Sequence, residues 1–334
     1  MWHLRLITIF ILIFFNEFLI YKLQSFFWSK IPCTENCTKI LFIADPQILG
    51  NNHELLIARV DSDQHMKKNF KEVFKFVKPD LVIFLGDLMD EGSIASDRQF
   101  LDYYKRFLKI FPISRNETEV IFISGDNDIG GEGYEKVEIK NVKRFNAIFG
   151  NETNWSFGNL EIFHVDRIQM KIPEIKNEVE GLIKIIIGHC SILHHPDSTS
   201  RKALEKIKPN LIFSAHDHQS MLLTFNPASN FYPKIEKISS KIEIKFENES
   251  LKEIQIPVAN YRMGTLTIGY GQAAITNDGV IYEPIFVLSR FYQFGIYFGF
   301  FIVYLFIICC WKILKKFWRI RKRRKNYRKL INEA

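Results

Sequence analysis

The 334-residue sequence is long enough for one domain of about 250 residues with additional segments. Its 45 basic and 37 acidic residues give a formal charge of +8, but eleven Lys and Arg lie between Lys312 and Lys329, followed by a single acid, Glu333. The rest of the chain is therefore close to neutral, which argues against a general binder of nucleic-acid phosphates, and 47% apolar residues exclude a disordered protein.

The first apolar run covers residues 6–21 and is interrupted by Asn16 and Glu17. It predicts either a cleaved signal sequence or an uncleaved signal anchor. We favour the anchor, because bulky residues follow and no small-residue cleavage site is visible, and we assign residues 1–30 to a cytoplasmic stub and this helix. Two cysteines come next, Cys33 and Cys37, which could pair in an oxidising compartment or remain free thiols.

Residues 31–290 contain short apolar runs that each end in a polar cluster. Four to six consecutive apolar, often β-branched residues are typical of a strand buried on both faces. Between the first two runs, apolar residues recur at three- and four-residue steps from Met66 to Val77, and Pro79 follows, which predicts a helix. This alternation indicates an α/β fold built from βαβ units. The runs are KILFIAD (39–45), LVIFLGD (81–87), VIFISGD (120–126), LIKIIIGH (182–189) and LIFSAH (211–216).

Every one of these predicted strands ends in Asp or His. A single Asp after a strand is usually a cap or a turn residue, but five such endings are not explained in that way. Ligands bind beyond the carboxyl ends of strands in α/β sheets, and carboxylates with imidazoles are the ligand set suited to Mn, Fe or Zn. We therefore predict a dinuclear metal centre. Its candidate ligands are Asp45, Asp87, Asp126, His189, His216 and His218.

Residues 291–311 form a run of 21 residues without a charge, long enough to cross a bilayer. The basic segment 312–334 follows directly, so the positive-inside rule predicts that this tail is cytoplasmic and that residues 31–290 form a lumenal domain. Five Asn-x-Ser/Thr sequons all lie between the two apolar runs, as expected of a lumenal glycoprotein. They begin at Asn36, Asn116, Asn151, Asn154 and Asn248.

Taken in chain order, the Asp and His clusters resemble the motifs of the calcineurin-like metallophosphoesterase family over about residues 41–218. The family pattern is Asp-x-His, Gly-Asp-x-x-Asp, Gly-Asn-His-Asp, a His after a strand, and Gly-His-x-His. The matching stretches are DPQ (45–47), GDLMD (86–90), GDND (125–128), GH (188–189) and AHDH (215–218). This resemblance implies a metallophosphoesterase β-sandwich flanked by helices, here with terminal transmembrane helices.

The resemblance also implies a role for each ligand and a pair of divalent cations, with Mn²⁺ expected and Fe or Zn as alternatives. Asp87 would bridge the two ions. Asp45 and His218 would complete one site. Asp126, His189 and His216 would complete the other.

Three positions depart from the family pattern. Gln47 replaces a His, and Asp126 replaces an Asn. Asn127 replaces the His that protonates the leaving group in the family, and loss of a general acid costs roughly 10²–10⁴-fold in rate. Either the register slips so that Asn127 is a ligand, or the leaving alkoxide is protonated through Asp128 and water, which makes Asn127 and Asp128 the predicted catalytic residues. The third interpretation is a weakly active or inactive homologue.

The stretches GDLMDEG (86–92), GDNDIGGEG (125–133) and YRMGT (261–265) are similar to the membrane-anchored branch that contains GPI-glycan ethanolamine-phosphate phosphodiesterases of the early secretory pathway. This implies hydrolysis of a phosphodiester on a GPI glycan, with GPI lipid or GPI-anchored proteins as substrates and no nucleic acid. The expected location is the membrane of the endoplasmic reticulum, the ER–Golgi intermediate compartment or the Golgi.

Two alternatives remain. The first is a lumenal phosphatase or phosphodiesterase that acts on another substrate. The second is a non-catalytic cargo adaptor, whose basic tail would be bound by cytoplasmic sorting machinery; contact of the tail with anionic lipid explains the same charges.

Overall fold

The computed structural model describes residues 2–33, 37–114, 117–133, 135–175, 181–226, 232–246 and 250–332. The sequons at Asn36, Asn116 and Asn248 lie outside these residues. The chain divides into two compact units, Ile20–Ser289 and a helical unit of Met1–Leu19 with Arg290–Ala334.

The larger unit contains two β-sheets within its described residues. In the first, the strand order is β10-β13-β12-β1-β2-β3, and β1, β2 and β3 run parallel to one another. Strand β2 and residues 40–43 of β1 have only apolar side chains, as expected of strands that are covered on both faces. The bounds are β1 Thr38–Ile43, β2 Leu81–Leu85, β3 Glu119–Ile123, β10 Ile242–Lys245, β12 Ile268–Thr276 and β13 Gly279–Val287.

The second sheet has the order β4-β5-β6-β7-β11-β8-β9, and its central strands β5, β6, β7 and β11 are parallel. Strands β3 and β4 therefore lie at the edges of their sheets. The bounds are β4 Asn154–Phe157, β5 Leu160–His164, β6 Ile183–Ile187, β7 Leu211–Ser214, β8 Met221–Phe225, β9 Lys234–Lys237 and β11 Leu251–Gln255.

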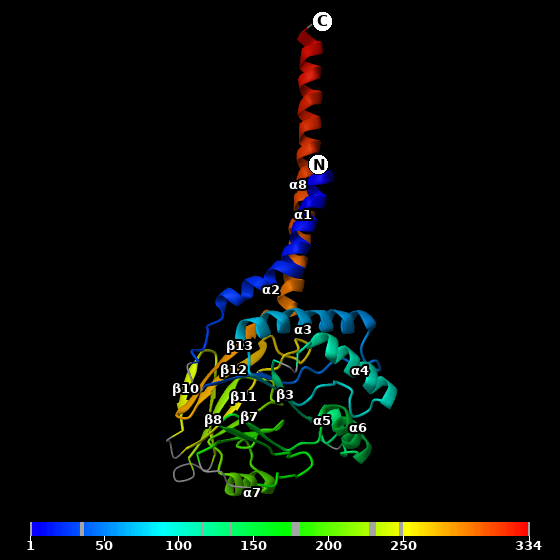
Figure 1. Ribbon diagram of the computed structural model, residues 1–334. Coiled ribbons are helices and arrows are strands. Elements are labelled where there is room, and N and C mark those ends of the chain that lie inside the picture. The colour runs from blue at the N-terminus through cyan, green and yellow to red at the C-terminus, as the bar shows by residue number, and fades with distance from the viewer. Residues whose placement is uncertain are drawn as a thin grey trace. The chain divides into compact units, whose positions relative to one another are not determined.

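The two sheets pack face to face between outer layers of helices (Figure 1). Helices α3 (Leu56–Val77), α4 (Asp97–Ile110) and α6 (Ile139–Phe149) bury apolar side chains against the first sheet. Helix α7 (Ser198–Ile207) covers the outer face of the second. Between the sheets, the rings of Phe42 and Phe213 stack with centroids 4.1 Å apart. The predicted β-sandwich flanked by helices is confirmed, with strands at the five expected runs.

Helix boundaries follow local sequence signals. Helix α4 begins after Ser96, whose hydroxyl accepts from the backbone amide of Gln99 while the Gln99 side chain accepts from the Ser96 amide. Helix α3 ends at Lys78, which has a positive φ of 50°, directly before Pro79. The predicted helix from Met66 to Val77 is therefore the C-terminal half of a longer one.

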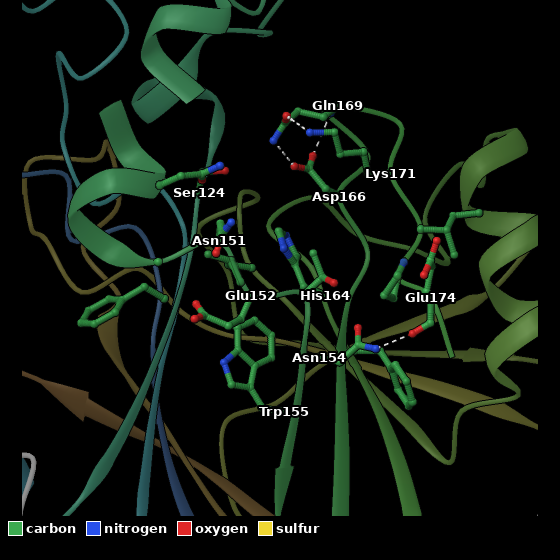
Figure 2. A pocket seen from close by; sticks show the side chains of 18 of the residues that line it. Ser124, Asn151, Glu152, Asn154, Trp155, His164, Asp166, Gln169, Lys171 and Glu174 are labelled. Carbon is green, nitrogen blue, oxygen red and sulfur yellow. Dashed lines mark hydrogen bonds between the residues drawn. The ribbon is translucent and has the colours of Figure 1, made fainter. Parts of the chain in front are cut away.

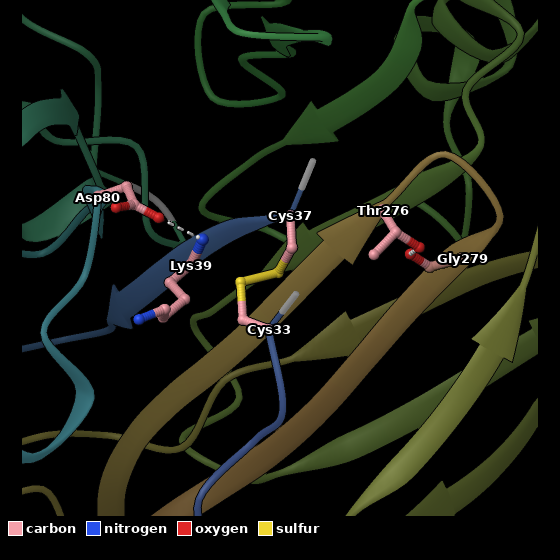
Figure 3. Close-up of a disulfide and its surroundings, with 6 residues drawn as sticks. All are labelled: Cys33, Cys37, Lys39, Asp80, Thr276 and Gly279. Atoms are coloured by element: carbon pink, nitrogen blue, oxygen red, sulfur yellow. Dashed lines mark hydrogen bonds between the residues drawn. A yellow bond between two sulfur atoms is a disulfide. The ribbon is translucent and has the colours of Figure 1, made fainter. Parts of the chain in front are cut away.

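Cys33 and Cys37 form a disulfide directly before β1 (Figure 3). The bond closes a short loop beside the turn between β12 and β13, where Thr276 and Gly279 lie. Pairing of these cysteines is one of the two outcomes left open by the sequence.

The helical unit consists of α1 (Trp2–Phe14), a π-helical turn at Phe15–Leu19 and α8 (Arg290–Asn332). Segments Arg5–Phe27 and Arg290–Asn326 are long and apolar enough to cross a membrane. Helix α8 extends beyond its apolar run, and the basic segment from Lys312 belongs to the same helix. The division of the chain into a stub with a signal anchor (1–30), a lumenal domain (31–290), a transmembrane helix (291–311) and a cytoplasmic tail (312–334) remains a prediction.

Polar side chains join the two helices of this unit. Asn16 Nδ2 donates to the carbonyl of Gln293, and Gln293 Nε2 donates back to the carbonyl of Asn16, at 3.0 and 2.7 Å. Glu17 accepts from Tyr297 and forms an ion pair with Arg290, both at 2.9 Å. Asn16 and Gln293 are fully buried. Because water cannot reach their amide groups in an apolar surrounding, these hydrogen bonds take the place of hydrogen bonds to water.

Candidate metal centre

The candidate ligands gather at one edge of the sandwich because the strands that precede them are parallel. Asp45, Asp87 and Asp126 follow β1, β2 and β3 of the first sheet within three residues. His189 and His216 follow β6 and β7 of the second sheet in the same way. Since the sheets are stacked, the carboxyl ends of both sets face a common space.

One group of ligand atoms is built around Asp126. Its Oδ1 lies 2.9 Å from His189 Nε2 and 3.2 Å from His216 Nδ1, and the two imidazole nitrogens are 3.2 Å apart. Asp87 Oδ1 lies 3.5 Å from His189 Nε2. Four atoms of the predicted second site therefore point at one another, as ligands of one ion do.

The second group contains Asp45, Asp87 and His218. Asp45 Oδ1 lies 3.9 Å from His218 Nε2 and has no hydrogen-bond partner in the part of the chain that the structure describes, although Asp45 is fully buried. An unpartnered buried carboxylate oxygen is costly unless a cation binds it. Gln47 Nε2 donates to Asp87 Oδ2 at 3.0 Å and lies 3.5 Å from His218 Nε2. The Gln47 side chain thus reaches the position between these ligands.

Burial dominates the electrostatics of the carboxylates. It raises the pKa of Asp45 to about 8 and also raises the pKa of Asp87. Burial alone would raise the pKa of Asp126 too, but hydrogen bonds to His189 and His216 lower it. Raised carboxyl pKa values mean that the negative charges of Asp45 and Asp87 are not balanced by nearby positive charge. Divalent cations bound at the site would balance them.

The imidazoles respond to the same carboxylates. Burial opposes protonation of His189, yet Asp87 and Asp126 hold its pKa well above the usual value. The hydrogen bond to Asp126 raises the pKa of His216, whereas burial lowers that of His218. The carboxylates around His189 and His216 thus stabilise positive charge on these two imidazoles. A metal ion bound to the imidazoles would supply that positive charge instead of protons.

The backbone at the centre is strained. Asp45, Gln47, Asp87, His216 and His218 all have positive φ, between 37° and 68°, although none of them is glycine. Such residues cost free energy and cluster where function requires a particular side-chain direction. Five of them within one cluster indicate a functional site.

Gly125 gives the centre its close packing. A methyl group on this residue would lie 2.1 Å from Asp87 Oδ1, which is too close for any side chain. Its φ of −111° is ordinary, so the requirement is for space and not for a special backbone conformation.

The sequence profile of the calcineurin-like phosphoesterase family matches residues 38–220, more than half of the chain. The chain belongs to the calcineurin-like phosphoesterase family. Together with the two ligand groups, this membership supports a metal-dependent phosphoester hydrolase. The donor set fits a pair of divalent cations.

Two named proteins are similar to this chain in sequence, and one solved structure is similar in fold. Metallophosphoesterase 1 from Ailuropoda melanoleuca is 28% identical over 170 residues, which are 49% of this chain and 43% of the relative. Cell division control protein 1 from Saccharomyces cerevisiae is 28% identical over 225 residues, 60% of this chain and 45% of the relative. The chain therefore matches less than half of the length of these relatives. The solved purple acid phosphatase PPD1 from yellow lupin, Lupinus luteus, has a TM-score of 0.48 at 11% identity, covering 78% of this chain and 53% of that one.

Asp126 and Asn127, which stand where the family motif has Asn and His, make contacts with different groups. Asn127 donates to both oxygens of Asp87, from its backbone amide and from Nδ2, each at 2.9 Å. Asp126, not Asn127, faces the imidazoles. These contacts favour Asp126 over Asn127 as a ligand, and the assignment remains a prediction.

Asp128 is fully buried, and its carboxylate accepts from the backbone amides of Leu88, Met89 and Gly125 at 2.9 to 3.1 Å. Burial raises its pKa to about 7. The side chain therefore ties the loop after β2 to the loop after β3. The catalytic role of Asp128 remains a prediction. Its hydrogen bonds also show that it positions the two loops that carry Asp87 and Asp126.

Two functional candidates escaped the sequence analysis. Cys190 belongs, with Asp126 and His216, to one of two groups of possible ligands whose atoms all lie within 4.8 Å of one another; the other group is Asp45, Asp87 and His189. The place of Cys190 directly after His189 was the available signal. Glu253, fully buried in β11, accepts from the amides of Ile192 and Leu193. No sequence signal distinguished Glu253, because β11 reads LKEIQ and contains two other polar residues.

Proposed function

We propose that this chain is a metal-dependent phosphodiesterase that hydrolyses a phosphodiester on a GPI glycan and releases ethanolamine phosphate. The observation that carries the hydrolase is the convergence of three buried carboxylates and three imidazoles at one edge of the sandwich, where Asp45 Oδ1 has no hydrogen-bond partner among the described residues. Resemblance to the membrane-anchored branch of the family supports the finer substrate assignment.

Divalent cations held at the centre supply Lewis acidity toward phosphoryl oxygens and lower the pKa of water. The chain itself positions the ligands. Asp87 faces both groups, and the two hydrogen bonds from Asn127 hold its carboxylate in place. Asn127 is partly exposed, so its amide can also donate to a phosphoryl oxygen of the substrate.

The membrane setting supports a lipid-linked substrate. Two candidate membrane segments flank the domain, and a tethered enzyme meets membrane-bound substrates at high effective concentration. We propose a lumenal orientation in the early secretory pathway. The Cys33–Cys37 disulfide, the exposed sequon at Asn151 and the basic end of α8 support this orientation.

The test compares the native protein with Asp87→Asn. We expect divalent cations to bind the native protein in stoichiometric amounts, and turnover of an aryl phosphodiester to fall at least about 10²-fold in the variant, because a neutral amide would hold divalent cations less tightly than the Asp87 carboxylate. Asp278→Asn, at an exposed position, is the matched control and should keep full activity.

The glycan assignment needs a second measurement. Cells that carry only Asp87→Asn should accumulate GPI anchors that retain the ethanolamine phosphate. If the anchors are unchanged while GPI-anchored cargo is mis-sorted, the chain acts as a cargo adaptor. If the aryl phosphodiester is hydrolysed and the anchors are unchanged, the chain is a phosphoesterase with another substrate.

A further inference from the structure

A cavity of about 790 Å³ lies between the edge strands of the two sheets. Its walls come from the end of β3, the C-terminal end of α6, strands β4 and β5, and the loop that follows β5. The volume suits a group larger than a phosphate or an ethanolamine. None of the six predicted metal ligands lines it.

The cavity lies directly beside the metal centre. Ser124 lines it and is followed in the chain by Gly125 and Asp126. On the other side, His164 lines the cavity at the end of β5 and pairs in register with Ile187 of β6, two residues before His189. A substrate whose phosphodiester is bound at the centre would therefore place an adjoining group in the cavity.

The charges of the lining exclude an anionic ligand. Four carboxylates line the cavity, and the only cation among its lining residues, all of which are described, is Lys171. Its ammonium donates to Gln169, whose amide in turn donates to Asp166 (Figure 2). The carboxylates are Glu152, Glu161, Asp166 and Glu174.

The remaining lining suits hydroxyl groups on a ring. Figure 2 shows the indole of Trp155 at the end of the cavity opposite the Asp166, Gln169 and Lys171 side chains. Asn154 Oδ1 and Glu161 Oε2 are buried oxygens that have no hydrogen-bond partner among the described residues. Acceptors without donors, beside an aromatic face, are complementary to a sugar, whose hydroxyls donate and whose C–H face packs on a ring.

We propose that this cavity binds a neutral sugar ring of the substrate, adjacent to the phosphodiester at the metal centre. The choice of mannose as the probe rests on the proposed GPI-glycan function, but the existence of a sugar site does not. Trp155 would pack on the ring, while Glu152 and Glu161 would accept from its hydroxyls.

The experiment uses the full-length protein in detergent, with N-glycans removed enzymatically so that a sugar on Asn151 or Asn154 does not compete. Binding of an α-linked mannotriose is measured by saturation-transfer NMR and calorimetry. We expect Trp155→Ala and Glu152→Gln each to weaken binding by about tenfold or more. Glu152 is exposed, so the second variant should fold normally. Glu243→Gln, at an exposed position of β10, is the control and should bind like the parent.

Kinetics separate this site from the metal centre. Both cavity variants should raise the KM for a mannosyl phosphodiester about tenfold at unchanged kcat, and leave hydrolysis of an aryl phosphodiester unaffected. Asp87→Asn should do the reverse: it should abolish turnover and still bind mannotriose. If mannotriose binding is absent, or equal in all the variants, or if ethanolamine binds in its place, the sugar site is refuted while the hydrolase stands. If mannotriose binds but no phosphodiester is hydrolysed, the proposed function fails and the sugar site stands.

Discussion

Replacement of Glu253 by Ala tests how the fold holds two metal ligands in place. The Glu253 carboxylate accepts from the amides of Ile192 and Leu193 at 3.0 and 2.6 Å, and from the hydroxyl of Ser214. Ile192 and Leu193 follow His189, and Ser214 ends the strand before His216. One buried side chain therefore connects the two loops that deliver imidazoles to the centre.

The magnitude follows from the groups left behind. Each buried donor that loses its acceptor costs about 1–3 kcal/mol. Part of this cost is offset, because burial raises the pKa of Glu253 and its removal relieves that penalty. We therefore expect Glu253→Ala to lower the free energy of unfolding by about 3 kcal/mol, near the lower end of the range for three donors. For a domain of this size, the corresponding fall in Tm is about 6–12 °C.

The assay is thermal and urea unfolding of the full-length protein, followed by tryptophan fluorescence with excess chelator. Glu243→Ala, which removes an exposed carboxylate from β10, is the control and should stay within about 0.5 kcal/mol of the parent. If Glu253→Ala unfolds within about 1 kcal/mol of this control, the carboxylate does not hold the loops together. The loosened loops should also bind divalent cations more weakly.

Three further predictions concern the centre itself. With chelator present, the free energy of unfolding should fall as pH rises from about 4 to 8, because burial raises the pKa of Asp45 to about 8 and of Asp128 to about 7. The folded protein keeps these two protons at a pH where the unfolded chain has lost them, and this stabilisation disappears as the pH passes the folded-state pKa values. Added Mn²⁺ should reverse this slope in melting experiments. If Cys190 binds a metal, the Co²⁺-loaded protein should show a thiolate-to-cobalt charge-transfer band that Cys190→Ser abolishes. Gly125→Ala should remove divalent-cation binding measured by calorimetry, because its methyl group would displace the Asp87 carboxylate.

Each of these predictions has a matched control. A flat stability profile between pH 4 and 8 in chelator would contradict the assigned carboxyl pKa directions. Replacement of Cys309 and Cys310, the other free cysteines among the described residues, should leave the cobalt spectrum intact. Gly295→Ala adds a methyl group with no neighbour within 4 Å and should bind cations like the parent.

The strands and most of the centre could be predicted because their signals are local. An apolar run such as LVIFL needs two covered faces, and the polar residue after it must then lie at a sheet edge. The positions of Asp87 and His189 after β2 and β6 were predicted in this way, and the chain order of the Asp and His clusters gave the resemblance to the family.

Features that depend on long-range pairing could not be predicted. The cavity exists because β3 and β4 are the edges of different sheets, and no local pattern states which strand lies at an edge. Asp128 carries the same motif signal as a metal ligand, yet the fold turns its carboxylate toward backbone amides. The positive φ of Asp45 is equally invisible, because the strain is imposed by the surrounding fold on a residue that is not glycine.

The polar contacts between Asn16, Glu17, Arg290 and Gln293 bear on how the protein can be produced. A recombinant form that keeps one hydrophobic helix and deletes the other would leave an amide and a charge without their counterparts in hydrocarbon. Such half-truncated versions should aggregate or be degraded. Both terminal helices are therefore best retained together or removed together.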